Sequence, residues 1–203
     1  MTIAIIDYEA GNLHSIISAL NKITNKKHSI IKDGNQNEAD VIILPGVGSF
    51  DQAMLKLKTA PNLIPYIINH IKAGKKFLGI CVGMQILANI GYENGSNSGL
   101  GVIEGEVKKI PSSSLKIPHI GWNNIAINHN SSYSQPFKEF DNKDFYFVHS
   151  YYFSCKNTDN IVASANYGVQ IPAIIATDNV VATQFHPEKS GEAGLEFLKL
   201  LIN

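Results

Sequence analysis

The chain contains no arginine, so all 17 of its basic side chains are lysines. Because no planar guanidinium is present, a carboxylate or phosphate has to be recognised by lysine, backbone N–H groups or neutral donors. The 17 acidic residues balance the lysines, and the formal net charge is zero. The charge therefore gives no support for binding to nucleic acid or to an anionic membrane surface. A composition rich in Asn, Ile and Lys is sufficient to explain the missing arginine.

Cysteine is scarce, and long apolar runs are missing. Two cysteines, Cys81 and Cys155, are too few for a disulfide framework and indicate a functional thiol in a reducing compartment. Residues 1–7 lack the basic region and apolar core of a signal peptide, and no apolar run approaches the roughly 20 residues of a membrane helix. We therefore expect a cytoplasmic protein. The histidines show no metal-ligand spacing, so we expect neither a metal ion nor a cofactor.

Short apolar runs alternate with helical patterns in the first half of the chain. Apolar runs bounded by turn residues predict buried strands at residues 3–6, 29–31, 41–44 and 75–80. Helical spacing of apolar residues predicts helices at 13–20, 50–57 and 63–73, the first capped by Asn12 and the last closed by Gly74. This order predicts an α/β fold with a mostly parallel sheet and helices on both faces.

The second half has a different pattern. Between residues 101 and 183 we expect antiparallel strands that extend or flank the parallel sheet, and a last helix at 193–202 closes the fold. The predicted strands are residues 102–110, 117–127, 145–153, 161–165, 173–176 and 180–185. Loops at 91–99 and 112–114 are rich in Asn, Gly and Ser and are expected to be flexible. No composition shift marks a linker, so we expect a single domain over residues 1–203.

The most informative stretch is residues 79–83, Gly-Ile-Cys-Val-Gly. It follows a strand-like run and precedes a helix-like run at 84–88, which places Cys81 at the apex of a strand–turn–helix. Glycines two positions before and after the thiol allow a sharp turn that a Cβ would obstruct. A helix N-terminus also stabilises negative charge on the sulfur. The pattern is the cysteine form of a nucleophile elbow; a buried structural cysteine is the alternative for this stretch alone.

A histidine and a glutamate could supply a base and the group that orients it. His186 follows the strand-like run 180–185, so it lies at the carboxyl end of a strand, the sheet edge where Cys81 also lies. Pro187 is expected to keep the segment extended, so that His186 and Glu188 point the same way. Glu188 would then hold the imidazole and stabilise its protonated form. A surface histidine with a solvated glutamate is the alternative.

The loop Pro45-Gly46-Val47-Gly48 follows another predicted strand. Two glycines around one valine make a mobile loop whose backbone N–H can face a bound carbonyl. With the N–H of Val82, the residue after the thiol, the Val47 N–H would form an oxyanion hole. An ordinary strand-to-helix turn explains any single Pro-Gly, but here three strand ends each carry one part that thiol chemistry needs.

These motifs together resemble the class I, triad-type glutamine amidotransferases. Further segments are similar to the glutaminase subunit of imidazole glycerol phosphate synthase, and the resemblance runs from residue 1 to the last helix. The segments that carry both resemblances are 79–85 (GICVGMQ), 186–188 (HPE), 45–48 (PGVG), 7–12 (DYEAGN), 118–123 (PHIGWN), 147–151 (FVHSY) and 182–190 (ATQFHPEKS). The resemblance implies a flavodoxin-like fold and hydrolysis of L-glutamine to glutamate and ammonia through a thioester on Cys81. It also implies a heterodimer with a TIM-barrel cyclase, which uses the ammonia to make imidazole glycerol phosphate and AICAR in histidine biosynthesis.

The resemblance also assigns roles to individual residues. It makes Cys81 the nucleophile, His186 the base and Glu188 the orienting group, with the loop 45–48 as a switch that turns an N–H into the site. Glu93 would pair with the α-ammonium of glutamine. The expected substrate-binding residues are Gln85, Glu93, His149, Ser150 and Tyr151, and those expected at the cyclase interface are Asn12, Trp122 and Lys189. For Trp122 alone, half-buried core packing is the alternative.

Other functions remain open at this level. The same glutaminase could serve a synthase of surface amino sugars, since that chemistry would be identical. A catalytically silent interaction or regulatory protein on the same fold is a second possibility, although Cys81, His186 and Glu188 all stand. A cysteine peptidase or γ-glutamyl hydrolase is a third, disfavoured by the cyclase-type segments.

Overall fold

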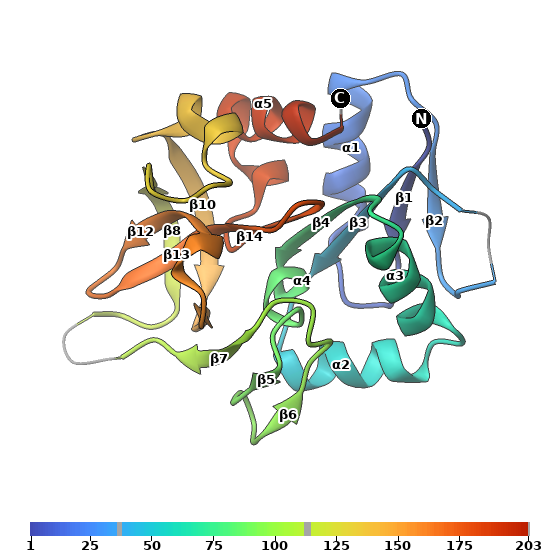
Figure 1. Cartoon of the computed structure of the whole chain (residues 1–203), viewed down its shortest axis with the longest axis horizontal. Helices are drawn as coiled ribbons and strands as arrows, with labels where there is room; N and C mark the ends of the chain where they lie inside the picture. Colours follow the sequence, from blue (N-terminus) through green and yellow to red (C-terminus); the bar gives the residue numbers. More distant parts are fainter. Residues whose placement is uncertain (36–37, 112–114, 203) are drawn as a thin grey trace.

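A large sheet with a parallel and an antiparallel half organises the molecule (Figure 1). The computed structural model describes residues 1–35, 38–111 and 115–202. Within them, eight strands follow the order β2-β1-β3-β4-β14-β13-β12-β9. The first five pair in parallel: β2 (His28–Ile31), β1 (Ile3–Ile6), β3 (Val41–Gly46), β4 (Lys76–Cys81) and β14 (Val180–Thr183). The predicted mostly parallel sheet is confirmed.

Helices cover both faces of the parallel half. Helix α1 (Leu13–Ile23) joins β1 to β2, and α2 (Phe50–Thr59) with α3 (Leu63–Lys72) joins β3 to β4. Because β2 and β4 lie on opposite sides of the β1–β3 pair, right-handed crossovers place these helices on opposite faces. Helix α5 (Gly191–Ile202) packs against α1. Figure 1 shows α1 and α5 together above the sheet, with α2 and α3 below it.

Two of the predicted helix ends are present in the structure. The side chain of Asn12 caps α1 by accepting a hydrogen bond from the N–H of Ser15 at 3.3 Å. Gly74 follows α3 with a φ of 72°, the left-handed conformation that glycine adopts without strain.

The antiparallel half extends the sheet and adds two smaller sheets beside it. Strands β13 (Gln170–Ala176), β12 (Ile161–Asn166) and β9 (Ala126–Ile127) continue from β14. One small sheet pairs β8 (His119–Asn124) with β10 (Asp144–His149). The other contains β11 (Tyr151–Cys155), β7 (Gly105–Lys109), β5 (Ile90–Gly91) and β6 (Asn97–Ser98). Among its described residues this half also contains the short 3₁₀ helices η1 (Gln135–Phe140), η2 (Thr158–Asn160) and η3 (Pro187–Lys189).

Several sequence-based boundaries were wrong. The predicted strand 145–153 is two strands, because the chain bends at Ser150 and passes from one small sheet to the other. The predicted strand 117–127 likewise divides into β8 and β9. The predicted loop 91–99 includes the last residue of β5 and all of β6, which pair as a hairpin; its expected flexibility stays a prediction. Residues 112–114, also expected to be flexible, lie outside the described residues.

The helix after Cys81 is shorter than the sequence suggests. Helix α4 spans only Val82–Gln85, whereas the apolar pattern predicted helix through residue 88. The carbonyl groups of Ile86 and Leu87 instead accept hydrogen bonds at 2.8 Å from the N–H groups of Leu100 and Val102. The chain from 86 to 88 is fully buried, so its apolar pattern reflects burial on all sides rather than one helical face.

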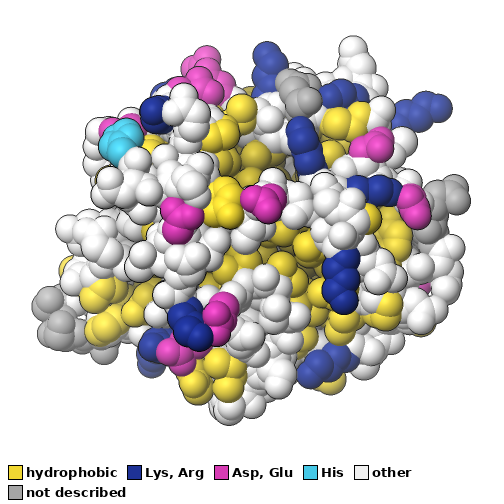
Figure 2. Space-filling view, viewed as in Figure 1, with side chains coloured by type: hydrophobic (Ala, Val, Ile, Leu, Met, Phe, Trp, Pro, Cys, Tyr) yellow, Lys and Arg dark blue, Asp and Glu magenta, His cyan; other side chains and the backbone are white. Residues whose placement is uncertain are grey.

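Two hydrophobic clusters stabilise the two halves of the molecule. One surrounds the parallel strands, and the other is rich in phenylalanine and lies between α5 and the antiparallel strands. On the face drawn in Figure 2, lysine and acidic side chains are interspersed, in keeping with zero net charge. In the chain as described, no helix is both long and apolar enough to cross a membrane.

Candidate active site

Cys81 stands at a strained turn between β4 and α4. Its φ of 56° and ψ of −111° lie outside the regions that non-glycine residues usually adopt. A Cβ on Gly83 would lie 2.0 Å from the carbonyl oxygen of Leu44, and a Cβ on Gly79 would lie 2.7 Å from that of Gly83. Both glycines are therefore required by close backbone approach, as the sequence predicted, and the strain falls on the cysteine itself.

His186 and Glu188 form a buried pair. The Nδ1 of His186 lies 2.8 Å from Oε1 of Glu188, and the two side chains are only 2% and 1% exposed. Burial alone would lower the pKa of His186, but the negative charges of Cys81 and Glu188 raise it to about 10. The other ring nitrogen, Nε2, is buried and has no hydrogen-bond partner among the described residues. The imidazole is thus held by Glu188 with Nε2 left for the thiol and its substrate.

The backbone around His186 differs from the expectation. Pro187 begins the 3₁₀ helix η3 instead of keeping the segment extended, because the N–H of Lys189 bonds the carbonyl of His186 at 3.0 Å. The tight turn still brings Glu188 beside the imidazole. The N–H of His186 also donates to the carbonyl of Tyr146 at 2.9 Å, which ties the segment to β10.

A cluster of aromatic rings packs against the residue that precedes His186 and holds the segment in place. Phe185, fully buried and directly before His186, stacks on Phe145 with ring centroids 4.1 Å apart. Its edge also meets Phe197 of α5 at 5.4 Å. Buried aromatic pairs of this kind add about 0.5–1.5 kcal/mol each beyond the area they bury. Close packing therefore limits how far His186 can move relative to β10 and α5.

Two glutamines complete the surroundings of the thiol: Gln85, which was expected to bind substrate, and Gln184, which was not predicted as a site residue. The Nε2 of Gln184 lies 3.8 Å from the sulfur of Cys81, and its Oε1 accepts from Nε2 of Gln85 at 3.0 Å. The Gln85 amide also donates to the carbonyl of Tyr151 at 2.9 Å. The side chain of Gln85 is buried. Gln184 stands two residues before His186 in the same motif, and this position could have indicated from the sequence that it lies near the thiol.

The loop after β3 does not have the arrangement expected for an oxyanion hole. The N–H of Val47 donates to the carbonyl oxygen of Ala10 at 2.8 Å. It is therefore engaged with the β1–α1 loop and not free to bind an oxyanion in this conformation. Gly48 follows with a φ of 99°, which favours glycine.

The thiol opens into a cavity of about 240 Å³. The predicted substrate-binding residues all line it, together with the thiol, the imidazole, the loop and two residues not predicted. These lining residues are Val47, Gly48, Cys81, Val82, Gln85, Glu93, Pro118, Val148, His149, Ser150, Tyr151 and His186. The carboxylate of Glu93 accepts a hydrogen bond at 2.8 Å from the N–H of Phe50, which begins α2. Burial raises the pKa of Glu93, and this bond partly opposes the rise.

A histidine missed as a site residue positions His149. The Nδ1 of His149 donates to the carbonyl of Tyr151 at 2.9 Å, so in the neutral ring Nε2 must accept. It accepts from Nδ1 of His119 at 3.0 Å. Burial lowers the pKa of His119 to about 4 and that of His149 to about 3. Both rings are therefore neutral near pH 7, and their hydrogen bonds fix the orientation of His149.

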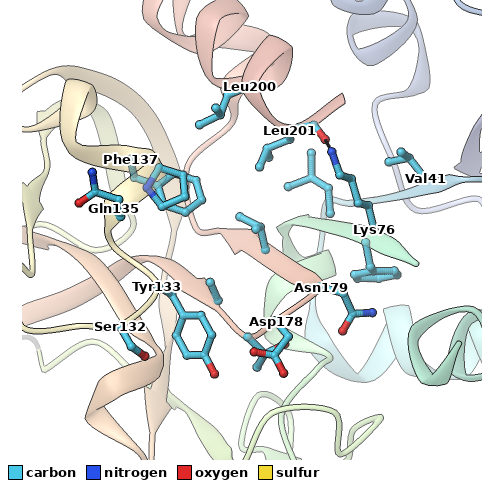
Figure 3. A pocket seen from close by; sticks show the side chains of 16 residues that line it. Val41, Lys76, Ser132, Tyr133, Gln135, Phe137, Asp178, Asn179, Leu200 and Leu201 are labelled. Carbon is cyan, nitrogen blue, oxygen red and sulfur yellow. Dashed lines mark hydrogen bonds between the residues drawn. The ribbon is translucent and has the colours of Figure 1, made fainter. Parts of the chain in front are cut away.

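A larger cavity, of about 440 Å³, lies away from this chemistry (Figure 3). Val41 and Lys76 line it from the first residues of β3 and β4, and Asp178 and Asn179 from the turn between β13 and β14. These positions belong to the opposite edge of the sheet from Cys81. No predicted site residue lines it, so the smaller cavity is the candidate active site. In the described parts of the chain, no group of three or more His, Cys, Asp or Glu side chains is arranged to hold a metal ion.

The residues expected at a partner interface lie outside the cavity. Trp122 is 58% exposed and meets the ring of Tyr146 edge-on at 6.2 Å, so it is not part of the core. The ammonium of Lys189 lies 6.0 Å above that same ring. Ile120, two residues before Trp122 on β8, is 59% exposed. Trp122, Lys189 and Ile120 thus form a mixed apolar and basic surface patch. Asn12 is half-buried at the start of α1, a helix that contacts η3.

The fold and the site define a class of protein, and comparison with known proteins agrees. The family described as glutamine amidotransferase class-I matches residues 4–202. Two solved structures share the fold: PurLQS from Thermotoga maritima (TM-score 0.77, 18% identity, 100% of this chain and 97% of that one) and a glutamine amidotransferase (TM-score 0.75, 16% identity, 99% of each chain).

Sequence relatives narrow the class. The chain is 45% identical over 202 residues to imidazole glycerol phosphate synthase subunit HisH of Methanothermobacter thermautotrophicus, covering 98% of this chain and 97% of the relative. It is 44% identical over 199 residues to the subunit of the same name from Oceanobacillus iheyensis, covering 97% and 96%. The chain therefore belongs to the class I glutamine amidotransferases, and within them to the HisH type.

Proposed function

We propose that this chain is the glutaminase subunit of an imidazole glycerol phosphate synthase and acts as a single domain over residues 1–203. It hydrolyses L-glutamine and passes the ammonia to a cyclase in histidine biosynthesis. The observation that carries the proposal is that Cys81 and His186 line the same cavity while Glu188 holds the imidazole, with Oε1 of Glu188 2.8 Å from Nδ1 of His186. The names of the relatives and the matched family over residues 4–202 support the pathway and the extent of the domain.

The reaction follows from the charges of the triad. With a pKa raised to about 10, His186 carries the proton near neutral pH and stabilises a thiolate on Cys81. The sulfur attacks the side-chain amide carbon of glutamine and forms a C–S bond. His186 then gives its proton to the departing nitrogen, so ammonia leaves and a γ-glutamyl thioester remains. The neutral imidazole takes a proton from water, whose oxygen breaks the thioester and releases glutamate.

The segment 45–48, whose first two residues end β3 rather than form a loop, would control the rate of this reaction. The tetrahedral intermediate carries a negative oxygen, and one preorganised donor to such an oxygen contributes about 2.7–4 kcal/mol to catalysis in a well-studied case. The Val47 N–H bonds Ala10 here, so we infer that the resting subunit is weakly active. Rotation of the Gly46–Val47 peptide would direct that N–H toward the cavity and complete the oxyanion hole with the N–H of Val82.

A TIM-barrel cyclase is the proposed partner, joined as a heterodimer through the exposed face that carries Trp122 and Lys189. An aromatic anchor in a mixed apolar and basic patch is typical of an interface hot spot. Asn12 would lie at the same boundary, near the entrance of an ammonia channel. We place the reaction in the cytoplasm, because it requires Cys81 as a free thiol and the thiol is unpaired here.

The experiment that tests the function replaces the nucleophile. Cys81→Ala should abolish glutamine hydrolysis while added ammonium still supports synthesis by the assembled cyclase. Cys155→Ser is the matched control, because burial raises the pKa of the Cys155 thiol to about 12 and Cys155 does not line the cavity. Persistent glutamine hydrolysis by Cys81→Ala would exclude the thioester. Loss of ammonium-dependent synthesis as well would exclude the separation of the two sites.

The other functions considered from the sequence are less well supported. A surface amino-sugar synthase would use the same chemistry, but the relatives' names favour the histidine pathway. A catalytically silent interaction subunit would not require a buried thiol next to a buried histidine that is oriented by a glutamate. A peptidase would need a site open to a chain, whereas the cavity of about 240 Å³ has the size of a single amino acid.

A further inference from the structure

A buried tyrosine hydroxyl next to the active-site loop has no hydrogen-bond partner. Tyr8 follows β1 and is 3% exposed. Its hydroxyl oxygen makes no hydrogen bond to any part of the chain that the structure describes. Buried hydroxyls are almost always bonded, because leaving one unpaired costs its full desolvation energy. The hydroxyl at this place therefore suggests a bond that forms in another state of the protein.

The hydroxyl lies against the backbone that the proposed switch must turn. A Cβ on Gly46 would stand 2.7 Å from the oxygen of Tyr8 and 2.6 Å from the nitrogen of Gly83. Tyr8 does not line the cavity that holds the thiol. It lies behind Gly46, where it can contact the loop backbone but not glutamine.

Rotation of the Gly46–Val47 peptide exchanges the directions of its two polar groups. In this structure the Val47 N–H points to the carbonyl of Ala10. After rotation the N–H faces the thiol, and the Gly46 carbonyl faces the β1–α1 segment that carries Ala10 and Tyr8. The Ala10 carbonyl is an acceptor and cannot bond another carbonyl. The rotated state therefore needs a donor on this side, since a buried carbonyl without one is costly.

We propose that Tyr8 is a positioning residue of the switch: its hydroxyl donates a hydrogen bond to the Gly46 carbonyl in the rotated state. That bond holds the Val47 N–H toward the oxyanion and so favours the active loop. The inference rests on the proposed function, because it assumes that the loop rotates when the subunit works. Burial, and secondarily the negative charge of Cys81, raise the pKa of Tyr8, so the hydroxyl keeps its proton and remains a donor.

The test compares Tyr8→Phe with the wild-type subunit, both assembled with the cyclase and supplied with the cyclase's nucleotide substrate. Phenylalanine keeps the ring and removes only the oxygen. We expect the stimulated kcat for glutamine to fall about tenfold, the effect of one hydrogen bond, while KM changes by less than about twofold. The thermal midpoint should stay the same or rise, because the resting state loses an unpaired buried group. Ammonium-dependent synthesis should match the wild type.

Tyr133→Phe is the matched control. It removes a tyrosine hydroxyl at the remote cavity (Figure 3) and should leave the stimulated kcat unchanged. Wild-type stimulation in Tyr8→Phe would overturn the positioning role. A fall in kcat accompanied by a lower thermal midpoint would also overturn it, since that pattern indicates damaged packing. If the wild-type complex itself did not hydrolyse glutamine, the proposed function would be wrong. The wild-type measurement therefore distinguishes failure of the proposed function from failure of the role of Tyr8.

Discussion

The backbone N–H of Val47 bonds the carbonyl oxygen of Ala10 at 2.8 Å, joining the loop after β3 to the loop after β1. At the same sheet edge, the thiol, the imidazole and its carboxylate already lie together. The proposed catalytic groups are thus assembled before activation, and one backbone donor is directed away from them. A single peptide rotation would complete the site without moving any of the three side chains.

Amide hydrogen exchange should detect that rotation. In the isolated subunit the Val47 amide is expected to be protected by its bond to Ala10. In the complex with the cyclase and its nucleotide substrate, protection should decrease, because the bond to Ala10 is broken in a fraction of molecules. The Asp7 amide, bonded to the carbonyl of Ile31 at 2.8 Å, is the internal control and should not change. Equal protection of Val47 in both samples would contradict the rotation.

Glu188→Gln should uncouple the imidazole from the thiol. The charge of Glu188 helps raise the pKa of His186 to about 10, so the neutral amide should lower that pKa, which NMR titration of the ring can follow. The amide can also stabilise the wrong tautomer. We expect kcat for glutamine to fall by about 10²-fold or more. Glu192→Gln, an exposed change on α5, serves as control. An unchanged His186 titration would show that Glu188 does not hold the proton.

The sequence predicted the parallel half well because each signal there was local. Four-residue apolar runs, an Asn cap and a closing Gly each act within one turn or strand. The elbow was also visible locally in its glycine spacing, although only Gly79 is required by a neighbour within the elbow, the carbonyl of Gly83, whereas Gly83 is required by the carbonyl of Leu44 on β3. The antiparallel half was harder. The bend at Ser150 depends on β11 finding β7, a pairing over about forty residues that no local pattern specifies.

The parts of the site that were missed depend on the same kind of contact. Gln184 reaches the sulfur, and Ala10 holds the Val47 N–H, only because separate strands end side by side. The end of α4 at Gln85 was missed because distant N–H groups take the next carbonyls. Motif resemblance identified which residues gather at the cavity, but it did not give the orientation of one peptide.

Trp122→Ala should weaken assembly more than it destabilises the fold. Because the indole is 58% exposed, its removal should change the free energy of unfolding by less than about 1 kcal/mol. An aromatic hot spot at the cyclase interface should raise the Kd of the complex about tenfold or more. Leu55→Ala, at a residue 52% exposed on α2, is the control and should leave the Kd unchanged. Calorimetric titration with the cyclase measures the Kd. A larger loss in the free energy of unfolding than in the free energy of binding would show that Trp122 stabilises the fold instead of the interface.

The histidine pair should make the subunit sensitive to mild acid. In the unfolded chain both rings titrate near the ordinary pKa of about 6.5, whereas in the fold burial lowers the pKa of His119 to about 4 and of His149 to about 3. Between those values the unfolded chain binds more protons, so the free energy of unfolding must fall as pH falls from 6.5 toward 4. His186 does not offset this loss, because its raised pKa, about 10, gives a contribution that is fully present below 6.5.

His119→Phe isolates this effect, since phenylalanine can keep the stacking on Phe147 and Tyr167 and removes one titrating ring. Between pH 7 and pH 5 the thermal midpoint of the variant should decrease by less than that of the wild type. The comparison does not depend on the variant's midpoint at pH 7. His129→Gln, at an exposed position, should follow the wild-type curve. If His119→Phe fell as steeply as the wild type, the acid sensitivity would have to come from groups outside the pair. A flatter curve would instead show that acid stability depends on the neutral ring that holds His149 at the rim of the cavity.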